Sequence, residues 1–196
     1  MQSNGSSETR HINDEFDLAE GCRRGDIEAY ERLYRDHSAR MKSIAFNMLG
    51  NRTDAEDAVQ DTFVKVYHKA GQFKGRSAFE TWIFRILVNV CHDLTRKKKR
   101  QLPRSETPLA DNESMFNTCE RGDLTMRLSL ERTLEELPER KRMIFLLFEV
   151  EGFKHSEIAE ILDIPEGTSK HLLFETRKAL QESFGTANQS GRGYAL

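Results

Sequence analysis

The sequence predicts an all-α protein made of two small helical domains that are joined by a flexible linker. Apolar residues recur with the 3.6-residue period of a helix along most of the chain, and no stretch shows a convincing strand alternation. The 196 residues are 37% hydrophobic and 32% charged, which suits two small cores better than one thick core. Residues 101–126 carry prolines and many small polar residues without an apolar period, which is typical of a linker.

The first predicted domain spans residues 14–100 and follows a polar tail, residues 1–13, that we expect to be disordered. It opens with a short helix and then a long one. Asp26 is the expected N-cap of the long helix because its carboxylate can accept from the first free backbone N–H groups. Gly50 is its expected end.

A third helix is predicted over residues 51–70, and its first half is rich in acidic residues. Thr53 and Glu56 have the spacing of a capping box at the helix start. Asp54 also lies in the first turn, where the helix dipole favours an anion. Part of this acidity is therefore expected to be structural.

The two faces of the third helix differ in chemistry. One side collects the residues expected in the core: Ala55, Ala58, Val59, Thr62, Phe63, Val66 and Ala70. The opposite side collects Asp57, Gln60, Asp61 and Val64. This second face is either an ordinary solvated surface with one stray valine or a surface on which a protein docks. A metal or catalytic site is disfavoured because a convex face has no cleft and no histidine stands at ligand spacing.

The fourth predicted helix, residues 78–100, follows the loop GQFKGRS and also has two faces. Its expected buried stripe is Phe79, Ile83, Ile86, Leu87, Val90 and Leu94, and the opposite stripe is Thr81, Arg85, Asn89, His92, Arg96 and Lys99. Amide, hydroxyl and guanidinium groups of this kind grip phosphates and read base edges. Aromatic residues beside the cations suit unstacked bases, although core packing is the alternative for Phe79 and Trp82.

The second predicted domain spans residues 127–184. Its last two helices are separated by a short turn, and Pro165 suits the first turn of the final helix, so the pair reads as a helix-turn-helix. A polar tail, residues 185–196, is expected to be disordered.

Composition excludes several classes of protein. The net charge is only −2, but basic residues gather in RKKKR at residues 96–100, and such local bunching attracts phosphate. The chain shows no membrane-length apolar run and no signal peptide, so we expect a cytoplasmic protein without membrane insertion. Three widely spaced cysteines predict neither a disulfide framework nor a zinc site. No nucleophile and base spacing, phosphate loop or ligand set is found, so we expect no catalytic residue, no metal and no cofactor.

Three motifs together resemble a known family. They are DAEDAVQDTFVKVY, then FKGRSAFETWIFRILVNVCHDLTRKKKR, then LEELPERKRMIFLLFEVEGFKHSEIAEILDIPEGTSK. In this order they are similar to regions two and four of the extracytoplasmic-function (ECF) group of bacterial sigma factors, over roughly residues 14–184. The resemblance implies a subunit that binds core RNA polymerase, recognises a promoter through both helical domains and opens the DNA.

The resemblance also implies site residues in the first domain, region two. The acidic helix would dock on a coiled coil of the largest polymerase subunit through Asp54, Glu56, Asp57, Gln60, Asp61 and Val64. The loop and the fourth helix would bind and melt the minus-ten element. The residues implied there are Phe73, Lys74, Arg76, Ser77, Phe79, Thr81, Trp82, Arg85, Asn89, His92, Arg96, Lys97, Lys99 and Arg100.

The second domain, region four, would bind the minus-thirty-five element as duplex. The residues implied are Thr168, Lys170, His171, Arg177 and Lys178. Here the sequence departs from the family pattern, because Leu172 and Glu175 stand where basic residues are common and Ser169 replaces a packing valine. Acidic residues outnumber basic ones in this part of the chain, which is unfavourable for a surface that meets phosphates.

Other functions remain open at this point. The final helix could serve a protein partner instead of DNA, and exposed apolar positions at Leu172 and Phe174 would suit an anti-sigma factor, a partner that the family implies. The whole chain could be a sigma-like protein that sequesters an anti-sigma factor without starting transcription, but such a mimic would not need RKKKR or the loop aromatics. An ordinary helix-turn-helix repressor would not need the acidic helix.

Overall fold

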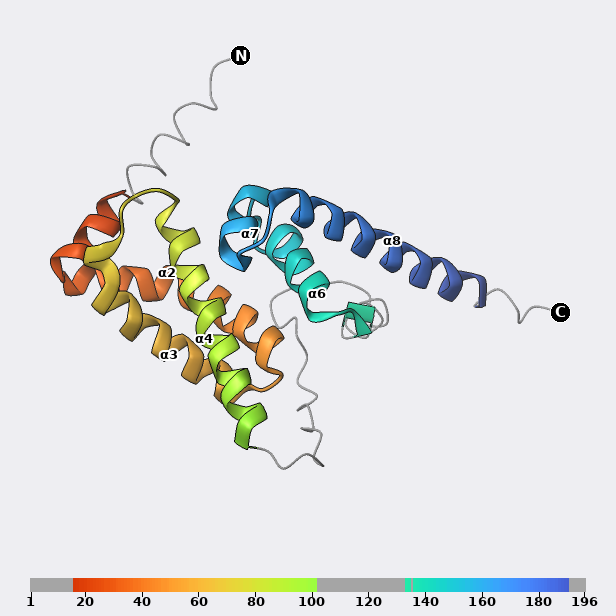
Figure 1. Cartoon of the computed structure of the whole chain (residues 1–196), viewed down its shortest axis with the longest axis horizontal. Helices are drawn as coiled ribbons and strands as arrows, with labels where there is room; N and C mark the ends of the chain where they lie inside the picture. The colour runs from red at the N-terminus through yellow and green to blue at the C-terminus, as the bar shows by residue number, and fades with distance from the viewer. Residues whose placement is uncertain (1–15, 102–132, 135, 191–196) are drawn as a thin grey trace, which may run out of the picture. The chain divides into compact units, whose positions relative to one another are not determined.

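The computed structural model describes residues 16–101, 133–134 and 136–190. Every regular element in these ranges is helical, which confirms the all-α prediction (Figure 1). The elements are α2 (Ile27–Leu49), α3 (Arg52–Lys69), η1 (Ala70–Gln72), α4 (Phe79–Gln101), α6 (Glu139–Phe145), η2 (Leu146–Val150), α7 (His155–Leu162) and α8 (Glu166–Ser190). A helix over residues 16–24 precedes α2.

The chain divides into two compact units. The first unit contains the helix at residues 16–24 and α2 to α4, and the second contains α6, η2, most of α7, and α8. The predicted tail at residues 1–13 lies outside the described residues, as does the predicted linker apart from Gln101, which ends α4.

The ends of α2 are formed by the residues that the sequence predicts. The side chain of Asp26 accepts a hydrogen bond from the backbone N–H of Glu28 at 3.0 Å. Gly50 adopts a left-handed conformation, with φ of 74°, and its N–H donates to the carbonyl of Phe46 at 2.8 Å. Glycine is suited to this position because it has no Cβ to clash with the backbone.

The start of α3 differs from the prediction. Its N-cap is Asn51 and not Thr53, because the Asn51 side chain accepts a hydrogen bond from the N–H of Asp54 at 2.8 Å. The predicted capping box is therefore wrong. Glu56 instead lies 3.4 Å from Arg52 in an ion pair one turn apart. Asparagine is as good an N-cap as threonine, and the helix begins two residues earlier than an N-cap at Thr53 would require.

α4 packs against both α2 and α3 in the first unit. It therefore has a wider buried face than the single stripe predicted. The buried residues are Phe79, Thr81, Ile83, Phe84, Leu87, Val88, Val90 and Cys91, whereas Ile86 and Leu94 are half-buried. Thr81 was expected on the polar stripe, but it is 1% exposed. A helix that contacts two neighbours buries residues on both sides of its first stripe.

The second unit contains the predicted helix-turn-helix, formed by α7, a turn at residues 163–165, and α8. α6 continues directly into η2, a π-helical turn in which the N–H of Glu151 donates to the carbonyl of Leu146 at 3.0 Å. α8 extends to Ser190, so residues 185–190 are helical where a disordered tail was expected. Extending an existing helix fixes only one residue for each added hydrogen bond, whereas starting one costs several.

Candidate functional site

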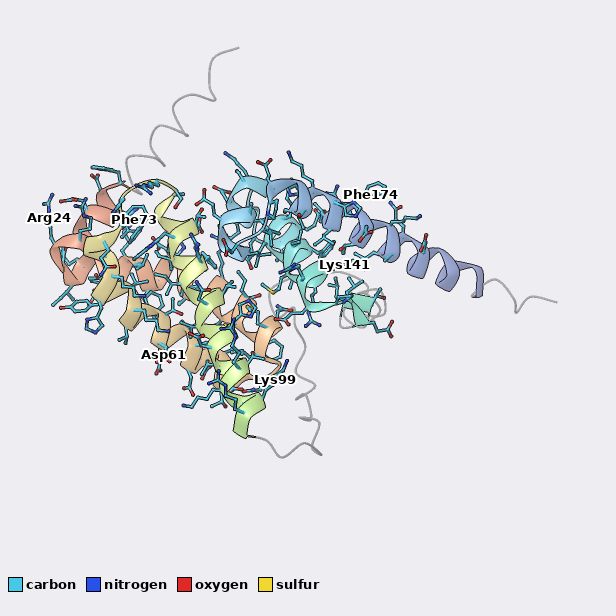
Figure 2. The ribbon with its side chains drawn as sticks, viewed as in Figure 1. Arg24, Asp61, Phe73, Lys99, Lys141 and Phe174 are labelled. Carbon is cyan, nitrogen blue, oxygen red and sulfur yellow. The ribbon has the colours of Figure 1, made fainter. Side chains whose placement is uncertain are left out.

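The exposed face of α3 carries four of the six residues expected to dock on the polymerase. Asp57, Gln60, Asp61 and Val64 are all exposed, and Val64 is 55% exposed. Among the residues that the structure describes, neither Asp57 nor Asp61 has an ion-pair partner. Figure 2 shows the carboxylate of Asp61 pointing away from the ribbon. Two unpaired carboxylates and one valine are therefore available to a partner on a single face.

The other two members of the docking set are engaged within the molecule. Asp54 is half-buried and accepts hydrogen bonds from Asn51 and from Lys98 on α4. Partial burial favours its neutral form, but the hydrogen bonds from Lys98 and Asn51 outweigh burial and hold the pKa of Asp54 below its usual range. Glu56 pairs with Arg52. Asp54 therefore supports the helix start and the contact between α3 and α4.

An apolar groove continues this face toward the end of α3. It has a volume of about 650 Å³ and is lined by Ile27, Tyr30, Glu31 and Tyr34 of α2 and by Phe63, Val64, Tyr67 and His68 of α3. The sequence reasoning missed this groove and placed Phe63 in the core, whereas Phe63 is half-buried and its ring lies 5.1 Å from that of Tyr34. Aromatic residues four apart on both helices were the signal that could have found it.

The polar stripe of α4 is exposed from Arg85 onward. Arg85, Asn89, His92, Arg96 and Lys99 all face solvent, as predicted, together with Lys97 and Arg100. Arg96 approaches Asp93 only to 3.8 Å. Within the described ranges Lys97, Lys99 and Arg100 have no ion-pair partner, and Lys98 is the residue of this cluster that turns back to Asp54. The end of α4 therefore presents free positive charge.

An aromatic cluster stands at the other end of α4, far from Lys99 (Figure 2). The ring centroids of Phe73 and Phe79 are 5.0 Å apart, those of Phe73 and Trp82 5.4 Å, and those of Phe79 and Trp82 5.6 Å with nearly parallel planes. Phe79 is buried, so it supports the cluster from beneath, while Phe73 and Trp82 are half-buried and can offer ring surface to a base.

Two residues expected to contact the minus-ten element are thus not at the surface. Phe79 is 2% exposed and Thr81 is 1% exposed, so neither can touch DNA in this structure. The loop cations are placed as expected, because Lys74 and Arg76 are exposed and Ser77 is half-buried. Gly75 between them has φ of 65°, a left-handed turn that brings the two cations to the outside of the loop.

Ion pairs within the second unit occupy the cations of α8. Lys170 lies 2.7 Å from Glu166, His171 lies 3.3 Å from Glu175, Arg177 lies 2.6 Å from Glu149, and Lys178 lies 3.9 Å from Glu182. All four basic residues are exposed, and Thr168 is half-buried. The basic residues expected to bind the minus-thirty-five element therefore all have a carboxylate nearby, unlike those at the end of α4.

Two departures from the family pattern in α8 have structural explanations. Ser169 is fully buried, and its hydroxyl lies 2.9 Å from Nδ1 of His155 at the start of α7. Glu175 pairs with Lys141 of α6 at 2.9 Å as well as with His171. The hydrogen bond and charge of Lys141 lower the pKa of Glu175. Ser169 and Glu175 thus connect α8 to the other helices of its unit.

Neither a candidate metal cluster nor a membrane span is found among the residues that the structure describes. They contain no cluster of three or more His, Cys, Asp or Glu residues placed to hold a metal ion. They also contain no helix that is long and apolar enough to cross a membrane. The notable surfaces are the acidic face of α3 with its groove, the basic face of α4 with its aromatic cluster, and the exposed face of α8.

Comparison with known proteins identifies the family of the chain. Residues 33–101 match the sigma-70 region 2 family, and residues 127–180 match the sigma-70 region 4 family, which places the chain in the class of promoter-recognition sigma factors. The ECF sigma-E factor of Escherichia coli K12 is 30% identical over 173 residues, 83% of this chain and 90% of that protein. The sigma-H factor of Pseudomonas aeruginosa is 28% identical over 176 residues, 85% and 91% of the two chains. The chain belongs to the ECF group of sigma factors.

Solved structures show the same fold. RpoE of Bartonella quintana, crystallised with the anti-sigma factor NepR, aligns with 81% of this chain and 98% of its own, at a TM-score of 0.69 and 24% identity. CnrH, solved with the cytosolic domain of CnrY, aligns with 88% of this chain and 97% of its own, at a TM-score of 0.65 and 22% identity.

Proposed function

We propose that this chain binds core RNA polymerase, directs it to promoters and opens the DNA for transcription initiation. Residues 14–100 act as region two and residues 127–184 as region four, joined by a linker at residues 101–126. The observation that carries the proposal is that neighbouring helices of one unit present unpaired charge of opposite sign. Asp57 and Asp61 of α3 and Lys97, Lys99 and Arg100 at the end of α4 are exposed without ion-pair partners in the described residues.

The acidic face of α3 is the proposed polymerase-docking surface, with Asp57, Gln60, Asp61 and Val64 at its centre. The apolar groove supports this assignment because a hydrophobic groove between two helices can receive the apolar side chains of a protein partner. Val64 belongs to both, so the carboxylates and the groove form one continuous surface. Such a surface suits a basic partner with apolar anchors and does not suit nucleic acid, which the carboxylates would repel.

The minus-ten element is proposed to bind along α4 and the preceding loop. The exposed cations follow the phosphates, Arg85 and Asn89 face the bases, and Phe73 and Trp82 stack on bases that leave the duplex. Phe79 supports the two outer rings from the core. Stacking of unpaired bases at one end of a basic helix favours the open form of the DNA over the duplex.

The minus-thirty-five element is proposed to bind α8 through Thr168, Lys170, His171, Arg177 and Lys178. Because their charges are balanced by nearby carboxylates, this contact is proposed to be weak and to depend on tethering by region two. We further propose that an anti-sigma factor regulates the chain, since RpoE of Bartonella quintana was crystallised with one. Phe174, which is 68% exposed on α8, suits such a partner.

Run-off transcription with purified core polymerase on a library of promoters tests the proposal. The expected result is that the chain directs transcripts from a subset of templates that share minus-ten and minus-thirty-five sequences. The alternative function is a sigma-like protein that sequesters an anti-sigma factor. A chain that binds core polymerase or an anti-sigma factor but starts no transcript from any template would favour that alternative and contradict initiation.

A further inference from the structure

Arg177 of α8 is held by two neighbouring residues of η2. Its Nη2 and Nε atoms lie 2.6 and 2.7 Å from one carboxylate oxygen of Glu149. Its guanidinium carbon lies 5.6 Å from the ring centre of Phe148, within the range of a cation–π contact. Phe148 in turn stacks on His155 at 4.5 Å, and His155 contacts the buried hydroxyl of Ser169. Arg177 is therefore seated in a preformed site.

The other cations of the exposed face of α8 are held differently. Lys170, His171 and Lys178 pair with carboxylates one turn away on α8 itself. Pairs of this kind on an exposed helix contribute little to stability and are screened by salt. Arg177 instead pairs with a residue 28 positions earlier in the chain and also covers an aromatic ring. A charged hydrogen bond combined with a ring contact holds it more firmly.

Arg177 also occupies a position from which it could reach DNA. Lys170, Phe174 and Arg177 follow one another at spacings of four and three residues, so they lie on one row of the helix. All three are exposed, and the side chain of Arg177 is 53% exposed. Figure 2 shows Phe174 on this outer side of α8. The row belongs to the surface proposed for the minus-thirty-five element.

We infer that Glu149 and Phe148 form an internal clamp that competes with DNA phosphate for Arg177. This inference rests on the proposed binding of duplex DNA by α8. Glu149 neutralises the guanidinium and fixes its direction, so Arg177 reaches a phosphate only after it leaves the carboxylate. Glu149 therefore limits the affinity of region four for DNA and makes recognition depend on the few contacts that can replace the clamp.

The clamp and a purely structural ion pair predict changes of opposite sign in the DNA affinity of Glu149→Gln. If Glu149 only fastened η2 to α8, Glu149→Gln would loosen the helix and weaken DNA binding. If the clamp exists, Glu149→Gln frees one cation and tightens DNA binding. The slope of log affinity against log salt concentration should then be steeper by about 0.9. The gain over wild type should then shrink about threefold as salt rises from about 50 mM to about 200 mM.

The experiment titrates the full chain against a labelled random-sequence duplex of about 30 base pairs, a length that covers one domain footprint several times over. Wild type is compared with Glu149→Gln, Arg177→Gln and the double variant. Glu182→Gln is the matched control, because it removes the same charge from an exposed carboxylate of the same unit. Thermal unfolding monitored by circular dichroism confirms that the variants remain folded.

We expect Glu149→Gln to raise the affinity for the duplex more than Glu182→Gln does. This increase should disappear when Arg177→Gln is also present. Unchanged or weaker binding by Glu149→Gln overturns the clamp, and so does a gain that persists without Arg177. Run-off transcription by the wild type distinguishes failure of the clamp from failure of the proposed function. Transcription without an effect of Glu149→Gln overturns the clamp alone, whereas no transcription from any promoter contradicts the proposed function itself.

Discussion

Asp57 and Asp61 are the two carboxylates on which polymerase docking should depend most. Reversing both charges, Asp57→Lys with Asp61→Lys, should weaken binding to core polymerase at least tenfold, because juxtaposed like charges cost several kcal/mol at an interface. Both side chains are exposed, so the helical fold should change in stability by less than about 0.5 kcal/mol for each substitution. Immobilised core polymerase and a concentration series of the chain measure the affinity.

Asp36→Lys is the control for this charge reversal. Asp36 is an exposed carboxylate on α2 that pairs with Arg32 and lies outside the proposed docking set. The Asp36→Lys variant should bind core polymerase with the same affinity as the wild type. Equal affinity of the double variant and the wild type would remove α3 from the docking surface.

Trp82 and Asn89 should matter more for strand opening than for initial binding to duplex promoter. Stacking of a base on an aromatic ring contributes about 1 to 3 kcal/mol, so Trp82→Ala should reduce the open fraction about fivefold or more. Asn89→Ala should show a smaller loss in the same direction. Permanganate footprinting reports unpaired thymines, and gel shift on the closed complex reports initial binding. Normal opening by both variants would refute this role of α4.

The residues of the two surfaces were predictable to different degrees. The exposure of Asp57, Gln60, Asp61 and Val64 follows from helical periodicity, because these residues lie opposite the apolar stripe of α3. The burial of Thr81 does not, since periodicity cannot say how many neighbours a helix will have. Its hydroxyl lacks a hydrogen-bond partner in the described structure, a feature that no sequence pattern announces.

At the scale of the helix, the cap of α3 can be tested directly. Asn51→Ala removes the acceptor for the N–H of Asp54 and should destabilise the first unit by about 0.5 to 2 kcal/mol. Thr53→Ala should change stability by less than about 0.5 kcal/mol, because Thr53 is exposed inside the helix. Trp82 is the single tryptophan, so its fluorescence reports chemical unfolding of this unit. Equal losses for the two variants would restore the predicted capping box.

The start of α4 is joined to α2 by a charged cluster that should make stability depend on pH. Glu80 pairs with Arg40, and Nδ1 of His37 lies 3.4 Å from its carboxylate. Burial favours the neutral carboxyl, but His37 and Arg40 outweigh it and lower the pKa of Glu80. The depressed pKa contributes stability above the ordinary value of about 4.3, and this contribution is lost as the pH falls through the folded-state pKa.

Glu80→Gln should therefore lower the free energy of unfolding at pH 7 by about 1 to 2 kcal/mol. The difference from wild type should narrow as the pH falls below the ordinary carboxyl pKa of about 4.3, and it is lost as the pH falls through the folded-state pKa of Glu80. Unfolding followed by Trp82 fluorescence at several pH values measures both effects. A difference that stays constant down to pH 3 would show that Glu80 contributes through packing and not through its charge.

The elements of the second unit illustrate what periodicity cannot provide. The helix-turn-helix was predictable from the apolar pattern and from the turn before Glu166. The acidic balance of α8 was also visible, but it indicated repulsion of DNA and not internal pairing. That Glu149 reaches Arg177 and that Glu175 reaches Lys141 depends on how η2, α6 and α8 pack. Contacts between residues far apart in sequence become apparent only in the folded chain.

At the scale of the whole molecule, the division into two helical units was easier to predict from the sequence than the binding surfaces were. Two helical units were predictable because the apolar period stops in the segment between them. The structure agrees, since each unit is compact by itself. The groove between α2 and α3 was not predicted, although Tyr30 and Tyr34 of α2 and Phe63 and Tyr67 of α3, each pair four residues apart, line it. Tertiary packing left their rings at the surface, with Tyr67 59% exposed.

The ion pair between Asp54 and Lys98 connects the two proposed binding surfaces of the first unit. Asp54 belongs to the polymerase-docking set, and Lys98 belongs to the basic end of α4. In the proposed complex, a polymerase residue that engaged Asp54 would release Lys98 toward the phosphates, and a phosphate that engaged Lys98 would release Asp54 toward the polymerase. Thermodynamic reciprocity requires the two effects to be equal, so each partner should raise the affinity of the chain for the other by the same factor.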